Sequence, residues 1–452
     1  MELFGTAGIR GPVTEITPGL ALAVGRAVGE DAAEGSGDLV VARDGRETGT
    51  ALAAAVEAGA TSAGADVLRA GRLPTPALAF ASRGRHGVML TASHNPPADN
   101  GIKLFVDGTE YDRAAERRIE TRVEAETGAA GWDEWGAPER IDPLEEYLDG
   151  VVDYALSHGS QPDTTVAVDC GNGMASIATP RVLDVLGADV VALNDNVDGH
   201  FPGRESKPTP ESLTDLRAFV ADGPATVGIG HDGDADRIVI VDGDGEVVHE
   251  DTVVAIIAEH YTRVSDAGDP VVVTTPNASR RIDERVTGAG GRVERVRLGA
   301  LHEGIATARA DGTDDTRVVF AAEPWKHIHT GFGGWIDGVV SAAVFTRLVA
   351  ESGLDALRAP VAERPYRKES VPCPDKRKMD AMARLETTLP EGFPGADIET
   401  EYGLRLELSG GAWTLVRPSG TEPYIRVYAE SEDVDELIAG VVEYVATAVE
   451  DA

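Results

Sequence analysis

The feature that most constrains the fold is a repeated alternation of short apolar runs, polar loops and helix-compatible segments. Residues 39–42 form an apolar run, residues 43–46 (Arg-Asp-Gly-Arg) a turn, and residues 51–63 an alanine-rich stretch with a helical pattern. The same order begins again at residues 166–168 and 271–274. Strands that alternate with helices predict parallel sheets with crossover helices, whose functional loops leave the carboxyl ends of the strands.

Length and turn-forming segments indicate several domains. A chain of 452 residues exceeds what one hydrophobic core usually serves. Breaks are expected near the acidic residues 142–149, near residues 250–251, and in the proline-containing residues 359–374. Beyond the last break the pattern becomes strand-rich, which predicts a smaller α+β domain at the C-terminal end.

The charge is strongly one-sided, because 77 acidic and 41 basic residues give a formal net charge of −36. Such a surface repels nucleic acid and anionic membranes, so neither is expected as a partner. It suits high salt, in which screening removes the self-repulsion, and we therefore expect a halophilic, haloarchaeal source. Lysine is scarce, so a lysine inside a polar loop carries weight.

The two cysteines and the first residues of the chain indicate the cellular compartment in which the protein is expected. Cys170 and Cys373 lie far apart, which gives neither a disulfide framework nor a metal-ligand cluster and favours a reducing environment. The start lacks the basic and apolar segments of a signal peptide. No apolar run approaches the length that spans a bilayer. The expectation is a soluble cytoplasmic protein.

Residues 91–96 (Thr-Ala-Ser-His-Asn-Pro) place a hydroxyl, an imidazole and an amide directly after an apolar run. Ser93 can accept a phosphoryl group there, with His94 and Lys103 close by to stabilise charge. Taken alone, Ser-His-Asn-Pro also fits an ordinary turn. The scarcity of lysine and the nearness of Lys103 favour the functional interpretation.

Asp232, Asp234 and Asp236 alternate with small residues, and Arg237 follows at once. Carboxylates this close repel one another unless a cation binds between them. A hard cation with oxygen ligands is expected, namely Mg²⁺ held by one oxygen from each aspartate and by a phosphate oxygen. An EF-hand calcium loop is disfavoured, because Gly243 stands where that loop needs glutamate. A solvated acidic turn is the remaining alternative.

Two further loops combine charged and polar groups. Residues 417–423 (Arg-Pro-Ser-Gly-Thr-Glu-Pro), followed by Arg426, offer guanidinium groups, hydroxyls and backbone amides to a phosphate dianion, or form a simple hairpin loop. Residues 323–327 (Glu-Pro-Trp-Lys-His) place an acid, a cation and an imidazole after an apolar strand. Those groups can hold sugar hydroxyls and exchange protons with them, although this signal is weak by itself.

Together these loops resemble those of the α-D-phosphohexomutase superfamily, in the same order along essentially the whole chain. Residues 3–11 (Leu-Phe-Gly-Thr-Ala-Gly-Ile-Arg-Gly) look like its amino-terminal signature, and residues 91–96 look like its phosphoserine loop. Residues 231–237 look like its metal loop and residues 417–423 like its phosphate-binding loop. Weaker matches are residues 71–76, 169–173 and 201–204.

The resemblance implies an α/β fold with four domains around a central cleft. Three related domains would have mixed or parallel α/β sheets, and the fourth would be the smaller C-terminal α+β domain. They would cover residues 1–148 with the phosphoserine loop, 149–250 with the metal, 251–362 with sugar recognition, and 363–452 with phosphate binding.

The resemblance also implies the site. In the family's mechanism a phosphoserine donates to one sugar hydroxyl, and the bisphosphorylated sugar returns its other phosphate to the serine; one Mg²⁺ per site neutralises charge. The catalytic set would be Ser93, Arg10, His94, Lys103, Arg237 and His327. The metal ligands would be Ser93, Asp232, Asp234 and Asp236. The substrate-binding set would be Glu323, Trp325, Lys326, Arg417, Ser419, Gly420, Thr421 and Arg426.

The third loop departs from the family pattern Gly-Glu-x-Ser-Gly-His. Glu323 and His327 align with it, but Trp325 replaces the serine and Lys326 the second glycine. Glu323 would contact two sugar hydroxyls, and His327 would transfer a proton. Trp325 could stack on a sugar face or narrow the pocket, while Lys326 could meet an anionic group.

The expected reaction interconverts 6-phospho and 1-phospho sugars, and glucosamine phosphate is the first choice because residues 4–11 look closest to phosphoglucosamine mutases. Mannose, glucose or pentose phosphates are the alternatives. A noncatalytic phosphosugar-binding paralogue and a magnesium-dependent phosphatase remain as other classes. A bisphosphorylated sugar would act as activator, and the enzyme would be a monomer or homodimer.

Overall fold

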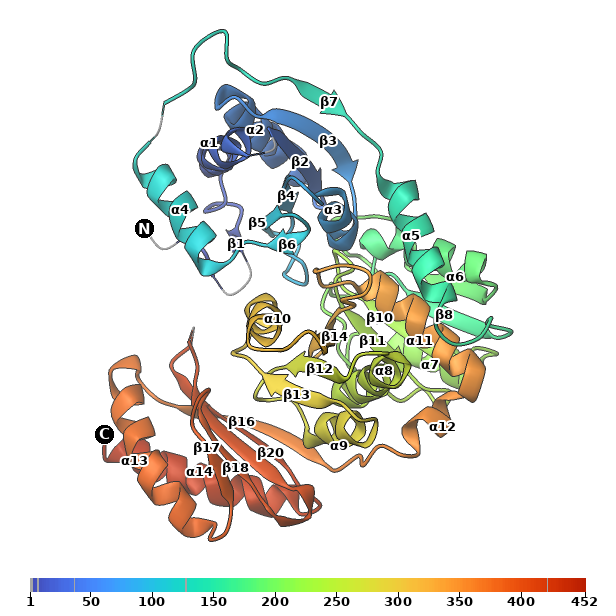
Figure 1. Cartoon of the computed structure of the whole chain (residues 1–452), viewed down its shortest axis with the longest axis vertical. Helices are drawn as coiled ribbons and strands as arrows, with labels where there is room; N and C mark the ends of the chain where they lie inside the picture. The colour runs from blue at the N-terminus through green and yellow to red at the C-terminus, as the bar shows by residue number, and fades with distance from the viewer. Residues whose placement is uncertain (1–2, 6–7, 36, 127, 421) are drawn as a thin grey trace. The chain divides into compact units, whose positions relative to one another are not determined.

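The computed structural model describes residues 3–5, 8–35, 37–126, 128–420 and 422–452. Its mixed α/β architecture confirms the fold class predicted from the sequence. The chain divides into two compact units, Met1–Ile257 with Val318–Ala359 and Ala258–Arg317 with Pro360–Ala452 (Figure 1). The four domain boundaries expected from the sequence stay predictions.

The first sheet of the larger unit has seven strands in the order β1-β5-β4-β2-β3-β7, with β6 paired to β5. β2 runs parallel to β3 and β4, whereas β4 and β5 are antiparallel. The strands are β1 (Ile9–Pro12), β2 (Asp38–Arg43), β3 (Asp66–Arg72), β4 (His86–Leu90), β5 (Asp99–Val106), β6 (Thr109–Glu110) and β7 (Pro138–Arg140). The helices are α1 (Pro18–Glu34), α2 (Gly49–Ser62), α3 (Thr75–Ala81) and α4 (Arg113–Glu124).

Helix α1 illustrates how local sequence sets an element's start. The side chain of Thr17 caps the helix by accepting a hydrogen bond from the backbone N–H of Leu20 at 3.2 Å. Pro18 occupies the first helical position, where its missing N–H costs nothing. The inner side of α1 is lined by small residues and packs against α2, so the two helices cover the same part of the sheet.

The second sheet of this unit has the order β11-β10-β8-β9. β8 is parallel to β9 and β10, and β10 is antiparallel to β11. The strands are β8 (Thr165–Asp169), β9 (Asp189–Leu193), β10 (Val227–His231) and β11 (Ile238–Val241). The helical elements are α5 (Leu144–Leu156), η1 (Met174–Ile177), α6 (Thr179–Leu186) and α7 (Thr214–Asp222).

A hairpin and a buried helix complete the larger unit. β14 (Thr316–Glu323) and β15 (Lys326–Ile328) pair antiparallel through a two-residue turn. α11 (Gly338–Ser352) is buried along most of its length and packs against α5 and α6. The short α12 (Leu354–Arg358) follows it, and α8 (Glu250–Val264) runs from this unit into the smaller one.

The smaller unit contains a parallel strand pair and an antiparallel sheet. β12 (Asp269–Thr274) and β13 (Arg292–Arg295) are parallel, with helices α9 (Arg280–Gly288) and α10 (Leu301–Ala310). The antiparallel sheet has the order β16-β20-β19-β18-β17. Its elements are β16 (Tyr366–Pro372), α13 (Asp375–Gly392), β17 (Asp397–Glu399), β18 (Leu404–Glu407), η2 (Ser409–Gly411), β19 (Trp413–Pro418), β20 (Tyr424–Glu430) and α14 (Val434–Glu450). This is the smaller α+β domain predicted for the C-terminal end.

Three of the loops singled out in the sequence have the same place in the topology. Residues 91–98 link β4 to β5, residues 232–237 link β10 to β11, and residues 324–325 link β14 to β15. In each case the loop leaves the carboxyl end of one strand and returns as its antiparallel neighbour. Within the described ranges, no helix is long and apolar enough to cross a membrane.

Candidate active site

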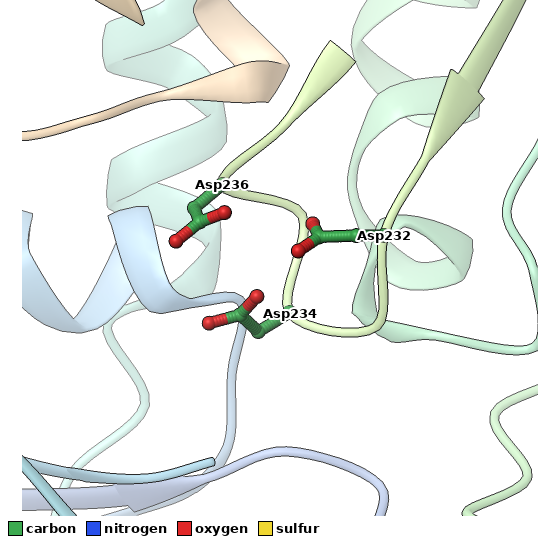
Figure 2. Close-up of side chains that lie close together, drawn as sticks. All are labelled: Asp232, Asp234 and Asp236. Carbon is green, nitrogen blue, oxygen red and sulfur yellow. The ribbon is translucent and has the colours of Figure 1, made fainter. Parts of the chain in front are cut away.

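Three aspartates gather on the turn between β10 and β11. Asp232, Asp234 and Asp236 each offer a carboxylate oxygen, and these oxygens lie within 4.8 Å of one another. Figure 2 shows the three side chains converging from one tight loop. All three are at most 1% exposed. The loop reverses sharply because Ala235 adopts a left-handed backbone conformation with φ of 61°.

The cluster is partly neutralised by Lys103, which lies on β5. Its Nζ is 2.9 Å from Asp236 Oδ2 and 3.3 Å from Asp234 Oδ2. Burial opposes the charge of Lys103, but the carboxylates of Asp234 and Asp236 outweigh it and raise its pKa. Thr75 adds a hydrogen bond from its hydroxyl to Asp234 Oδ2 at 2.6 Å. β5, which carries Lys103, and α3, which carries Thr75, therefore stabilise the aspartate loop between β10 and β11.

Lys103 alone does not balance three buried carboxylates. Burial, and then the charges of Asp236 and Asp234, raise the pKa of Asp232 well above its ordinary value. Burial opposes the ionisation of Asp236 as well, but Lys103, Lys326 and Arg237 hold its pKa below the ordinary value. Among the described residues, Asp234 Oδ1 and Asp236 Oδ1 are buried without a hydrogen-bond partner. Buried carboxylate oxygens that accept no hydrogen bond fit, at this spacing, a hard divalent cation such as Mg²⁺.

Ser93 lies directly against this cluster. Its Oγ donates a hydrogen bond to Asp232 Oδ2 at 2.7 Å, and it lies 3.3 Å from His94 Nδ1. Ser93 is 1% exposed and has φ of 52°, a conformation that is strained for a residue with a side chain. The backbone N–H of Ser93 donates to Thr91 Oγ1 at 2.8 Å, which holds the strained residue in place.

Arg46 holds the loop that carries Ser93, and sequence reasoning missed it. Its guanidinium donates to the backbone oxygens of Ser93 and Asn95 at 3.0 and 2.7 Å, and also to those of Pro96 and Asp99. Asp44, which is fully buried, pairs with Arg46 Nε at 3.0 Å. The sequence shows residues 43–46 only as a turn, because contacts to backbone oxygens leave no residue-type pattern.

Arg237 and Arg10 add positive charge near the aspartate cluster and His94. Arg237 Nε lies 3.8 Å from Asp232 Oδ2 and from Asp236 Oδ1. Arg10, on β1, has a buried Nε without a hydrogen-bond partner among the described residues. Burial, followed by the charges of Arg237 and Arg10, lowers the pKa of His94 to about 3. His94 is therefore neutral near pH 7 and presents a polar but uncharged group.

The turn between β14 and β15 sends its side chains in two directions. The hairpin pairs Glu323 with Lys326 and Ala322 with His327, so Glu323 and Lys326 share one face. His327 lies on the other face, where it is 1% exposed and its Nδ1 is 3.0 Å from the hydroxyl of Ser341 on α11. Burial lowers the pKa of His327 to about 3. The proton transfer expected of His327 stays a prediction.

Trp325 occupies the turn with φ of 66° and packs against an apolar cluster of the second sheet that includes Leu213 and Val239. Its backbone oxygen accepts a hydrogen bond from Ile238 N at 3.2 Å. An isolated bridge also pairs Lys326 with Arg237. These contacts place the turn against the loop that carries the three aspartates, residues 232–237, called the metal loop here. The sugar contacts predicted for Trp325 stay a prediction.

The predicted phosphate-binding loop belongs to the smaller unit. Arg417 and Arg426 are direct partners on the antiparallel strands β19 and β20. Like charges placed opposite each other repel. Glu422 pairs with Arg426 and offsets part of this repulsion, and an anion between the two arginines would offset more. The Nε atoms of both arginines are buried without hydrogen-bond partners among the described residues. Thr421 lies outside the described residues, and the roles of Ser419 and Gly420 stay predictions.

Lys378 is a second residue that sequence reasoning missed. It lies on α13, and its Nζ donates to the backbone oxygens of Ser419 and Glu422, each at 2.6 Å. The side chain is 9% exposed, so this buried lysine holds the loop through two backbone oxygens. As with Arg46, its partners are backbone oxygens, and only the scarcity of lysine marks it in the sequence.

The chain matches a family of known enzymes over three stretches. The description of that family is phosphoglucomutase/phosphomannomutase, with alpha/beta/alpha domain I over residues 1–130, alpha/beta/alpha domain II over residues 145–245 and the C-terminal domain over residues 370–448. The chain therefore belongs to this family and to the α-D-phosphohexomutase superfamily, as its motifs predict.

Individual relatives sharpen this assignment. The chain is 40% identical over 439 residues to a phosphopentomutase of Thermococcus kodakarensis. It is 41% identical over 444 residues to a probable phosphoglucosamine mutase of Methanopyrus kandleri. Each alignment covers 95% of this chain and 94% of the relative. The chain is a phosphosugar mutase, an isomerase that acts as an intramolecular phosphotransferase.

A solved structure supports the fold. The crystal structure of a phosphoglucomutase/phosphomannomutase family protein from Burkholderia thailandensis aligns with a TM-score of 0.86 at 24% identity. The alignment covers 99% of this chain and 97% of that one. At this identity the likeness concerns the fold alone.

Proposed function

We propose that this mutase moves a phosphoryl group between two hydroxyls of a sugar phosphate by way of phosphorylated Ser93. The observation that carries the proposal is the 2.7 Å contact between Ser93 Oγ and Asp232, which joins two loops 139 residues apart. A serine in a buried acidic cluster would be repelled once phosphorylated, unless a cation is bound there. Mg²⁺ held by Asp232, Asp234, Asp236 and the phosphoserine would neutralise the charge of the transferring group.

The chain's own residues have distinct tasks in this scheme. In the first step the bond between phosphorus and Ser93 Oγ breaks as a bond to the sugar hydroxyl oxygen forms. The proton of that hydroxyl ends on Ser93 Oγ, and the product is a bisphosphorylated sugar. Lys103, Arg10 and Arg237 place positive charge around the phosphoryl oxygens, while neutral His94 can hydrogen-bond without adding charge. The bisphosphorylated sugar then turns over, and its other phosphate is transferred to Ser93. Sugar binding by Glu323 and phosphate binding by Arg417 and Arg426 are separate parts of this proposal.

For the substrate we propose glucosamine 6-phosphate and glucosamine 1-phosphate. The amino-terminal motif supports this choice, and so does the similarity to the Methanopyrus kandleri protein. A phosphopentose is the second candidate. The Thermococcus kodakarensis phosphopentomutase supports it, and so does Lys326, a cation on the face of Glu323 that would disfavour the ammonium form of an amino sugar.

Phosphorus NMR of the protein with each sugar phosphate tests the reaction. The panel contains glucosamine, mannose and glucose 6-phosphates and ribose 5-phosphate, each with Mg²⁺ and a trace of the sugar bisphosphate. A new 1-phosphate signal is expected with one of them. Release of inorganic phosphate alone would instead indicate a phosphatase, and unchanged spectra with every sugar would contradict a mutase.

Intact mass spectrometry tests the phosphoserine separately. A fraction of the purified chains should carry one phosphate, and the Ser93→Ala variant should carry none. Phosphate that persists in Ser93→Ala would place the modification elsewhere and overturn the proposed mechanism. The cytoplasmic location and the monomeric or homodimeric state stay predictions.

A further inference from the structure

An irregular segment between β9 and α7 touches both catalytic loops of the larger unit. Residues 196–206, called the strap here, lie against the turn that contains Arg46. A Cβ atom on Gly199 would lie 2.4 Å from the backbone oxygen of Gly45 and 2.7 Å from Arg46 Cα. Only glycine allows so close an approach between two backbones. The strap therefore packs on the turn whose Arg46 holds the loop of Ser93, residues 91–98, called the serine loop here.

The strap also contacts the serine loop itself. The hydroxyl of Ser206 donates to the backbone oxygen of Asn95 at 2.9 Å, and Ser206 is 4% exposed. The guanidinium of Arg46 lies over the ring of Phe201, 5.1 Å from its centroid. Arg46 in turn holds Ser93 and Asn95 through their backbone oxygens. Phe201 therefore supports the serine loop through Arg46.

The same strap holds the metal loop. Arg204 Nη2 donates to the backbone oxygen of His231 at 2.6 Å, next to the first aspartate of the cluster. Arg204 is fixed by Asp169, whose Oδ2 lies 2.9 Å from its Nε. A Cβ atom on Gly233 would lie 3.2 Å from the ring of Phe201 and 2.7 Å from the backbone oxygen of Ser93. Phe201 thus packs where the two loops meet.

The strap is itself held in a defined conformation. Phe201 has φ of 51° and is 7% exposed. Asn172 accepts a hydrogen bond from Gly203 N at 2.9 Å and donates to the backbone oxygen of Asn196 at 3.2 Å. A strained aromatic residue persists only where its surroundings hold it. The strap is therefore suited to transmit position from one loop to the other.

We propose that the strap sets the position of Ser93 relative to the aspartate cluster, with Phe201 and Arg204 as positioning residues of the phosphoryl transfer. This inference rests on the proposed function. Displacing reacting groups by about 1 Å can cost about a hundredfold in rate even when the change lies away from the chemistry. The strap variants should therefore slow transfer without weakening the binding of the sugar.

The test compares strap variants with a matched control in the full-length phosphorylated enzyme. Phe201→Ala and Arg204→Lys should each lower kcat per phosphorylated chain by about 10- to 100-fold, with KM within about twofold of the parent. Phe201→Leu keeps part of the side-chain volume, so its kcat should lie between those of Phe201→Ala and the parent. Glu205→Ala changes an exposed side chain of the same strap and should match the parent. Intact mass gives the phosphorylated fraction, and phosphorus NMR gives the rate with the sugar found in the panel.

A cycle with Ser206→Ala tests whether the strap acts as one body. If removing the contact of Arg204 or of Ser206 displaces both loops, the two substitutions have the same effect. The fold-decrease in kcat of the double variant Arg204→Lys with Ser206→Ala should then be smaller than the product of the two single fold-decreases. Independent, multiplicative losses would mean that each residue serves only its own loop.

Three results separate the possible failures. Strap variants that lose phosphorylated chains but keep the parent's kcat per phosphorylated chain would reveal only a folding defect and overturn the inference. A raised KM with unchanged kcat would overturn it too. A parent enzyme that carries no phosphate and turns over no sugar would instead overturn the proposed function on which the inference rests.

Discussion

The serine loop and the metal loop have the same topological place and are held in different ways. Each is the link of an antiparallel hairpin, and each is gripped by an arginine that pairs with an aspartate, Asp44 with Arg46 and Asp169 with Arg204. Arg46 contacts the backbone oxygens of three residues of its loop and that of Asp99, where β5 begins. Arg204 contacts one backbone oxygen of the strand that leads into the metal loop, that of His231. The serine loop is therefore shaped by hydrogen bonds, while the metal loop depends on charge balance.

The largest effect expected from this difference is on the metal loop. Asp232→Asn removes one carboxylate and should lower turnover by more than about a thousandfold, because oxygen ligand and charge are lost together. Without Mg²⁺ the variant should be at least as stable as the parent, because repulsion within the cluster falls. Thermal unfolding with and without Mg²⁺ gives the stability of the metal-free and the Mg²⁺-bound forms of each protein. The parent should gain about 2.7 kcal/mol at a Mg²⁺ concentration 100 times its Kd, and the variant should lose most of that gain.

Asp244→Asn is the matched control for that experiment. Asp244 is exposed on the neighbouring turn after β11, and its loss should change neither turnover nor the Mg²⁺ response. A metal-free Asp232→Asn protein that is much less stable than the parent would contradict a loop governed by charge.

The serine loop should respond in the opposite way to loss of its arginine. Arg46→Ala leaves Asp44 buried without its cation and several backbone oxygens unpaired, so it should cost about 3–5 kcal/mol of unfolding free energy. Mg²⁺ should stabilise the variant and the parent by the same amount, because the substitution lies outside the aspartate cluster, so the difference between them should remain. Urea unfolding of Arg46→Ala and of the control Arg113→Ala, an exposed arginine on α4, measures the difference. A stability difference between Arg46→Ala and the parent that disappears on adding Mg²⁺ would contradict a loss that arises from Asp44 and the backbone oxygens of the serine loop.

The pH dependence of stability sharpens the same contrast by a smaller amount. The pKa of Asp232 is raised in the folded protein, so between its unfolded and folded values the folded state binds the extra proton. Metal-free stability from this group is therefore present below the unfolded pKa and falls as pH rises through the folded one. Mg²⁺ requires the ionised carboxylate, so bound Mg²⁺ should remove this slope.

Asp44 provides a second pH dependence of the same sign. Burial raises its pKa against the opposing charge of Arg46, and it lies in the serine loop's support. The slope due to Asp44 should remain with Mg²⁺ present, while that due to Asp232 should vanish with Mg²⁺ or in Asp232→Asn. Unfolding free energies measured from about pH 4, near the unfolded pKa of an aspartate, to about pH 8, with and without Mg²⁺, separate the two. Identical slopes in all cases would contradict the assignment to Asp232.

How far the sequence reached depends on the kind of contact. Apolar runs followed by polar turns located the strands and the loops of Ser93 and the aspartates, because those patterns are local. Arg46 grips backbone oxygens, and such contacts leave no pattern in the sequence. Arg204 stands in the weaker motif match at residues 201–204, which gave it no role. The face on which His327 lies depends on a two-residue turn, and a change of one residue in that turn would send it to the other side.

The smallest differences between the two loops are expected from salt, which acts on exposed charge. With a net charge of −36, the protein should unfold at higher temperature as KCl rises from dilute buffer to molar concentrations. The carboxylates of the cluster are buried, so screening reaches them weakly, and KCl should not replace Mg²⁺ there. The parent, Asp232→Asn and Arg46→Ala should therefore show nearly parallel increases in unfolding temperature with KCl, measured by circular dichroism. An increase confined to the parent would mean that salt stabilises the cluster itself, and full stability in dilute buffer would contradict the expected adaptation to high salt.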